Sequence, residues 1–139
     1  MPDPFKAYDI RGIYPDQLDE DLARATGNAV AQVLDLAGKR FAVGRDMRVS
    51  SPMLKQAFIE GLVAGGVLVI DCGMLSTPAL TWSMHELATA GGGAQITASH
   101  NPSQYGGIKI TGPGFQPVAA GSGMEEIEKA ARACRISSS

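Results

Sequence analysis

A serine within residues 97–102, Thr-Ala-Ser-His-Asn-Pro, is the residue best placed to do chemistry in this chain. The segment follows a short apolar run at 92–96 that is typical of a buried strand, so Ser99 is expected on a loop just past a strand end. His100 follows it directly, and Lys109 lies close behind in the sequence. A loop hydroxyl with imidazole and ammonium groups nearby could act as a nucleophile and surround the phosphate that it carries.

Two kinds of chemistry are open to such a serine, hydrolysis and phosphoryl transfer. A serine hydroxyl is a poor nucleophile unless a base or a reactive phosphoryl donor lies beside it. His100 is an awkward base for Ser99, because adjacent side chains on extended backbone point apart. The chain also lacks the Gly-x-Ser-x-Gly turn, which disfavours a serine hydrolase. Phosphate fits better, since backbone N–H groups of a glycine-rich turn can converge on an anion that Lys109 also attracts.

Helical and strand patterns alternate along the chain and must position this loop. Apolar spacing and cap signals predict four helices, at 19–37, 51–64, 77–87 and 122–134. The expected caps are Asp19, Ser51, Thr77 and Ser122. Short apolar or alternating runs predict four strands, at 41–43, 67–70, 92–96 and 108–110. The aliphatic run at 67–70 indicates a strand covered on both faces, and the alternation at 108–110 an edge strand.

Strands separated by helices favour an α/β fold, a three-layer α/β/α sandwich. Its mixed, mostly parallel sheet is expected to have about four strands, with helices on both faces. The 139 residues suffice for one hydrophobic core, so we expect a single domain over 1–139, with a disordered tail at 136–139. Ligands of such sheets bind beyond the carboxyl ends of the strands. Three loops leave those ends, at 44–50, 72–76 and 97–107, which places the serine at the functional edge.

Composition excludes several classes of function. A net charge of −2 makes nucleic acid an unsuitable partner, and no apolar run approaches the ~20 residues that span a bilayer. Without a signal-peptide pattern, the chain is expected in the cytoplasm. Cys72 and Cys134 are too few for a zinc site. The acidic run 19–21 opens a helix, where it complements the helix dipole, so it does not predict a metal site.

Three segments together resemble one known family, the α-D-phosphohexomutases. Residues 97–102, with Tyr105, Gly107 and Lys109 behind them, resemble the phosphoserine loop of that family. Residues 5–12, Phe-Lys-Ala-Tyr-Asp-Ile-Arg-Gly, resemble the N-terminal motif of its phosphomannomutase/phosphoglucomutase branch, and residues 44–51 resemble a further shared motif. One position departs: the family usually has Asn after the tyrosine, whereas this chain has Gly106.

The resemblance implies a phosphoryl carrier. Ser99 would hold a phosphoryl group, exchange it with a sugar monophosphate through a hexose 1,6-bisphosphate, and bind Mg²⁺ through a phosphoryl oxygen. Arg11, His100 and Lys109 would lie around the transferring group. His100 and Lys109 would transfer the proton, and Arg11 would stabilise the phosphate. Tyr8 would line the substrate side. For Arg45 and Arg48 the sequence leaves open whether they contact substrate, form an ion pair at a helix start or brace a loop.

The family enzyme has four domains, and this sequence resembles only the first. The chain is therefore expected to be the phosphoserine domain I of a mutase acting on hexose phosphates, inactive alone, with domains II–IV of the same polypeptide as its partners. The apolar surface left for those domains predicts some self-association. A stand-alone phosphate-binding or interaction module is the alternative. A dinucleotide-binding domain is weaker, because the glycines at 91–93 precede a strand instead of following one.

Overall fold

The computed structural model describes residues 4–6, 9–98, 101–102 and 104–138, and a five-stranded mixed sheet forms its centre. The strands are β1 (Ile10–Ile13), β2 (Arg40–Arg45), β3 (Leu68–Met74), β4 (Gly93–Ile96) and β5 (Tyr105–Thr111). They lie in the order β1-β5-β4-β2-β3. Strands β3, β2 and β4 run parallel, whereas β5 is antiparallel to both of its neighbours, β4 and β1. The predicted mixed, mostly parallel sheet is confirmed, with one strand more than expected.

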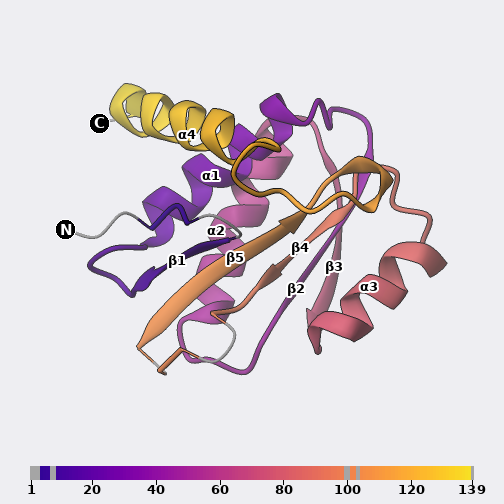
Figure 1. Ribbon diagram of the computed structural model, residues 1–139, viewed down its shortest axis with the longest axis horizontal. Coiled ribbons are helices and arrows are strands. Elements are labelled where there is room, and N and C mark those ends of the chain that lie inside the picture. The colour runs from indigo at the N-terminus through magenta and orange to yellow at the C-terminus, as the bar shows by residue number, and fades with distance from the viewer. Residues whose placement is uncertain (1–3, 7–8, 99–100, 103, 139) are drawn as a thin grey trace.

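Helices cover both faces of this sheet (Figure 1). Helices α1 (Glu20–Val33), α2 (Ser51–Ala64) and α4 (Met124–Ser138) lie on one face, where α1 packs against both α2 and α4. Helix α3 (Thr77–Glu86) packs on the other face, against β2 and β4. Successive strand residues follow this division: Val43 belongs to the large core, whereas Ala42 packs with Leu80 and Met84 of α3. The three-layer α/β/α arrangement is therefore confirmed.

The sequence prediction missed β1, and two other strands lie elsewhere in the sheet than expected. β1 contains Arg11 and Gly12, which weaken its strand signal, and it becomes a strand by pairing with β5. That pairing makes β5 an interior strand, so the edge position predicted for 108–110 was wrong. Residues 68–70 of the run predicted at 67–70 belong to β3, which lies at the opposite edge, and Leu68 at its start is 55% exposed. The expectation that both its faces are covered was therefore also wrong.

Helix ends differ from the prediction where local hydrogen bonds decide them. Asp19 caps α1 as predicted, but the helix ends at Val33 because Asp35 turns to a positive φ of 55°. The cap of α3 is Ser76, one residue before the expected Thr77. The hydroxyl of Ser51 bonds to Asp46 instead of capping α2.

The C-terminal helix α4 also differs at both ends. Ser122 accepts a hydrogen bond from the Ala119 N–H, and the Glu125 carboxylate accepts one from the Gly121 N–H, so the predicted capping box is not formed. The helix continues past Cys134 to Ser138. Residues 136–138 therefore extend α4 instead of forming the expected tail.

The close approach of α1 and α2 depends on glycine. A Cβ on Gly61 would lie 2.0 Å from the Arg24 carbonyl oxygen, and one on Gly27 would lie 2.2 Å from that of Phe58. Both helices therefore touch through bare backbone, which holds α2 firmly and with it the loop that precedes α2.

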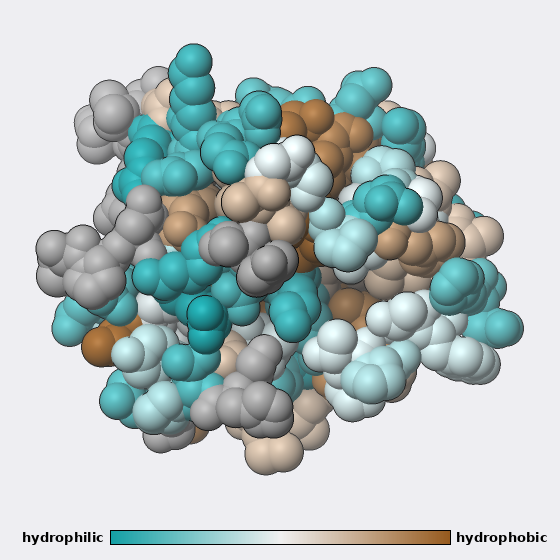
Figure 2. Space-filling model, viewed as in Figure 1, coloured by the Kyte–Doolittle hydropathy of each residue, from teal (hydrophilic) through white to brown (hydrophobic). Residues whose placement is uncertain are grey.

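The face drawn in Figure 2 is largely hydrophilic, with apolar side chains in separated areas. Among the described residues, the most exposed large apolar side chains are Met47 (85%) and Val49 (89%), in the loop between β2 and α2. Self-association through exposed apolar surface stays a prediction. No helix in the described part of the chain has the length and apolar character to cross a membrane.

Candidate functional site

The loop between β4 and β5 leaves the carboxyl end of β4 and carries the predicted nucleophile. Ser99 and His100, and Tyr8 near the N-terminus, lie outside the described residues. The residues that flank the serine are described. Thr97 N–H donates to the Gly107 carbonyl (2.9 Å), and Asn101 N–H donates to the Ala98 carbonyl (3.1 Å). Both stems of the loop are thus fixed by backbone hydrogen bonds.

Arg11 reaches this loop from β1. Its Nη1 donates to Asn101 Oδ1 at 2.7 Å, and its Nε pairs with the carboxylate of Asp9 at 3.0 Å. Asp9 is buried, so it holds the guanidinium in one place, while the Arg11 side chain remains 36% exposed. These two bonds use two of the five N–H donors of a guanidinium. An anion approaching the loop would meet the remaining donors.

A cavity of about 210 Å³ opens beside Arg11. Among the residues that the structure describes, its lining consists of Lys6, Arg11, Gln17, Asn101 and Tyr105, which supply two cations, two amides and a phenol but no carboxylate. The volume is several times the ~30 Å³ that a water molecule occupies in the liquid, so a phosphate group has room. The lining makes the cavity suited to an anion.

Lys109 lies on the same face of the sheet as Arg11. Arg11 is opposite Gly107 across β1 and β5, and Lys109 follows Gly107 by two residues on β5. Gly107 itself contributes no side chain to this face, and a Cβ there would lie 2.4 Å from the Thr97 carbonyl oxygen. Two of the predicted cationic residues therefore share one surface, although Lys109 does not line the cavity.

The sequence prediction missed three residues that line this cavity. Lys6 lies in the N-terminal motif and Asn101 in the serine segment, so both motifs were recognised, but no role was predicted for these two residues. Gln17 also has a structural role, since its side-chain oxygen accepts a hydrogen bond from the Ile13 N–H at 2.7 Å. No sequence signal marks Gln17, because its place depends on the turn after β1.

Arg48, in the loop between β2 and α2, contacts the same loop between β4 and β5. Its guanidinium donates to the carbonyl oxygens of Asn101 (2.7 Å), Pro102 (2.7 Å) and Tyr105 (3.3 Å). Its Nε also pairs with Asp46 Oδ2 at 3.0 Å. These contacts favour the loop-bracing role that the sequence left open. Arg45 donates to the Asp46 carbonyl (3.0 Å) and so belongs to the same turn.

Asp46 is the anchor of that turn. Burial alone would raise the pKa of its carboxyl group, but hydrogen bonds from Ser51, from the Arg48 backbone and side chain and from Thr97 outweigh this and leave the pKa below its ordinary value. Asp46 is therefore charged at neutral pH and holds Arg48 in position.

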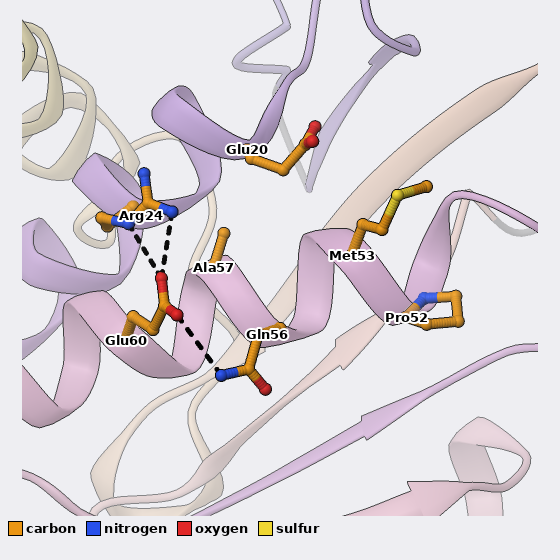
Figure 3. A pocket seen from close by; sticks show the side chains of 7 residues that line it. All are labelled: Glu20, Arg24, Pro52, Met53, Gln56, Ala57 and Glu60. Atoms are coloured by element: carbon orange, nitrogen blue, oxygen red, sulfur yellow. Dashed lines mark hydrogen bonds and ion pairs between the residues drawn. The ribbon is translucent and has the colours of Figure 1, made fainter.

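A second concave region lies between α1 and α2, with a volume of about 330 Å³ (Figure 3). Arg24 is the one cation among its described lining residues, and both Nε and Nη2 of Arg24 bond to Glu60 Oε1 at 3.0 Å. With Glu20 also in the lining, this region has no surplus of positive charge for a phosphate.

Metal ligands were expected from Ser99 through a phosphoryl oxygen, with the other ligands outside this chain. Within the described ranges, no three His, Cys, Asp or Glu residues lie together in a way that could hold a metal ion. The acidic run 19–21 is used at the start of α1, where Asp19 accepts from the Leu22 N–H at 2.8 Å. The described residues thus do not form a metal site of their own.

Fold and cavity together define an α/β/α domain with a cationic, loop-bounded site at the carboxyl edge of its sheet. Residues 3–134 match the family described as phosphoglucomutase/phosphomannomutase, alpha/beta/alpha domain I. The chain belongs to this family and corresponds to its domain I, as the resemblance predicted.

Similar proteins agree with this assignment. The phosphohexose mutases protein of Xanthomonas campestris pv. campestris (strain B100) is 43% identical over 123 residues, covering 88% of this chain and 27% of that protein. A phosphomannomutase of Vibrio cholerae serotype O1 is 39% identical over 127 residues, covering 89% of this chain and 27% of its own length. A crystal structure of a phosphoglucomutase/phosphomannomutase family protein from Burkholderia thailandensis superposes with a TM-score of 0.80 at 34% identity, over 95% of this chain and 30% of that chain. The chain thus spans little more than a quarter of the length of these relatives.

Proposed function

We propose that this chain is the phosphoserine-bearing domain of an enzyme that interconverts hexose 6-phosphate and hexose 1-phosphate, a phosphotransferase of the isomerase class. The observation that carries the proposal is the bond between Arg11 and Asn101, which joins a cation of β1 to the loop that contains Ser99. The adjoining cavity, whose described lining includes the cations Lys6 and Arg11 and no carboxylate, supports a phosphate at that place. Membership of the family supports the reaction class.

The proposed reaction consists of two transfers that balance. In the first, the bond between Ser99 Oγ and phosphorus breaks while a hydroxyl oxygen of the sugar monophosphate bonds to the phosphorus. The sugar hydroxyl loses its proton and Ser99 Oγ gains one, which produces a hexose 1,6-bisphosphate and a free serine. In the second, Ser99 Oγ takes the other phosphoryl group, the protons move in reverse, and the isomeric monophosphate leaves.

The residues of this chain divide these tasks in the proposal. His100 and Lys109 transfer the proton, and Arg11 stabilises the negative charge on the phosphoryl oxygens as it moves. Tyr8 lines the substrate side. The shared sheet face of Arg11 and Lys109 supports their acting on one group.

The remaining parts of the reaction lie outside this chain. The expected partners are domains II–IV of the same polypeptide, and their absence predicts that the chain alone does not turn over substrate, since transfer depends on positioning and charge. Mg²⁺ is expected to bind a phosphoryl oxygen on Ser99 together with ligands from those domains. The described residues offer no ligand cluster for it, so no step above depends on the metal.

Intact mass of the purified chain tests the phosphoserine. After incubation with excess hexose 1,6-bisphosphate, we expect the chain to gain one phosphoryl group, which fragment mass spectra place on Ser99 and a phosphatase removes. Ser99→Ala should abolish the gain, while Ser103→Ala, a matched control in the same loop, should retain it. A phosphoryl group mapped to another residue would overturn the site. Mutase turnover above the Ser99→Ala background would overturn the predicted inactivity of the isolated chain.

The alternative, a module that binds phosphate without transfer, has the cavity itself in its favour, since the described lining supplies two cations, two amides and a phenol. It predicts saturable binding of inorganic phosphate together with no gain of mass.

A further inference from the structure

The segment after the proposed nucleophile is held by a second arginine besides Arg11. Arg48 donates to three backbone carbonyl oxygens that belong to a part of the chain more than fifty residues away, at 101, 102 and 105. Its side chain is only 12% exposed. A guanidinium with this many defined bonds in a mostly buried place fixes the backbone that it touches.

Asn101 links Arg48 to Arg11. Its side-chain oxygen accepts from Arg11 and its backbone carbonyl accepts from Arg48, both at 2.7 Å. The residue is therefore held from two sides by two different arginines. Any movement of the backbone at Asn101 would break the Arg48 bond and displace the side chain that orients Arg11.

Asp46 keeps Arg48 in this position through its own bonds. It pairs with Arg48 Nε, accepts from the Arg48 backbone N–H at 3.0 Å and accepts from Ser51 at the start of α2. The Asp46 N–H donates to the Ile96 carbonyl at the end of β4 (3.0 Å). The pair is thus tied both to α2 and to the strand that enters the serine loop.

The charge of the pair argues for positioning instead of direct attraction of phosphate. Asp46 neutralises Arg48, so the pair adds little net charge to the site. Carbonyl oxygens that face an anion repel it, and Arg48 occupies three of them with hydrogen-bond donors. The conformational entropy of this loop is therefore lost during folding, and phosphate binding does not have to order it.

We infer that Asp46 and Arg48 are positioning residues that hold Asn101, Pro102 and Tyr105, the described part of the chain after Ser99, in place beside the proposed phosphate site. The inference rests on the proposed function, because it assigns a purpose to the loop that carries Ser99. It adds two residues to the site that act through Asn101 and not by touching phosphate.

Hydrogen exchange of single amides tests the brace without any ligand. In Arg48→Met and Arg48→Lys we expect the amides of Asn101 and Tyr105 to exchange about tenfold faster, while the α1 amides Thr26 and Val30 keep their rates. Lysine should not rescue, because it keeps the charge but cannot donate to three carbonyls and a carboxylate at once. The matched control is Arg24→Met, which removes an arginine ion-paired to Glu60 away from the loop.

A phosphate titration of the same variants separates positioning from a merely structural role. By nuclear magnetic resonance, inorganic phosphate should shift the amide signals around Arg11 in the wild type and in Arg24→Met, and both Arg48 variants should need about tenfold more phosphate. The gain of phosphoryl mass from hexose 1,6-bisphosphate should slow in parallel.

The outcomes of these two measurements are distinguishable. Unchanged exchange at Asn101 and Tyr105 in both variants would overturn the brace. Faster loop exchange with unchanged phosphate affinity would show the pair to be structural only. If exchange in α1 rose as much as in the loop, the role would be global stability and the inference would fail. Absence of phosphate binding and of phosphorylation in the wild type would refute the proposed function, while the exchange result would still decide whether Arg48 braces the loop.

Discussion

Arg48 and Arg24 each form an ion pair with a carboxylate, Arg48 in the turn before α2 and Arg24 on the surface of α1. The two ion pairs have different roles. Arg24 connects α1 to α2 at the surface (Figure 3), where it and Glu60 are both nearly half exposed, and its side chain bonds to carboxylate oxygens of Glu60 and Asp21. Arg48 is mostly buried, and besides pairing with Asp46 it donates hydrogen bonds to backbone carbonyl oxygens of another loop. The difference shows that the role of an ion pair depends on what the arginine holds besides its partner.

Removing the carboxylate is expected to have the largest effect in the loop region. Asp46→Ala leaves Arg48 without its partner in a poorly solvated place and should lower the free energy of unfolding by about 3 kcal/mol. Urea unfolding followed by circular dichroism measures this. Asp46→Asn, which retains an acceptor for Ser51, should lose less, and equal stability of Asp46→Ala and wild type would remove the contrast between the two regions.

Gly107→Ala should have the next largest effect, because it inserts a methyl group between two backbones. Its Cβ would lie 2.4 Å from the Thr97 carbonyl oxygen and 2.9 Å from that of Ile10. We expect a loss of about 2 kcal/mol and weaker phosphate binding, since β1 and the loop must separate. Gly112→Ala is the matched control in the same part of the chain, because its nearest neighbour, a Leu34 methyl group, is 3.5 Å away. Equal losses in both variants would refute the close approach.

The pH dependence of stability sharpens the comparison further. The folded-state pKa of Asp46 lies below its ordinary value, so the carboxylate stabilises the fold above the unfolded pKa and loses that contribution as the pH falls through the folded one. The stability difference between wild type and Asp46→Asn should therefore shrink on acidification below about pH 4. Thermal unfolding of both proteins across acidic buffers measures it, and a difference that grew on acidification would contradict the assignment.

The smallest effect is expected at the helix surface. Hydrogen bonds from Arg24 and Gln56 lower the pKa of Glu60, but the group is exposed to solvent and its charge is screened. Glu60→Gln should leave stability within experimental error, and phosphate binding should not change. A large loss in this variant would mean that the two arginine pairs are equivalent after all.

The fold was largely predictable from the sequence because its strongest signals are local. Helix α1 has apolar residues on one face and an aspartate cap, and β2 and β4 are short apolar runs closed by polar loops. The sheet edges were not predictable in the same way. β1 is a strand only because β5 lies beside it, and β3 looks buried in sequence although it lies at an edge. Pairing of distant segments decides both, and no local pattern records it.

The site follows the same rule. Arg11 and Lys109 were found because motifs name them, and the structure places both on one sheet face. The bonds of Arg48 to carbonyl oxygens were beyond sequence reasoning, since a carbonyl is common to every residue and carries no signature. Ser99, His100 and Tyr8 stay predictions that the proposed experiments address.

The pairing of β1 with β5 also sets an order of events during synthesis. Ile10 lies opposite Ile108 and Arg11 bonds to Asn101, so nearly a hundred residues separate the two halves of the cavity. The first strand has no sheet partner until β5 has left the ribosome, whereas β2, α2 and β3 can assemble earlier from nearby segments. The anion site is therefore expected to form later than the parallel part of the sheet, and an incomplete chain released before residue 105 would lack the strand that pairs with β1.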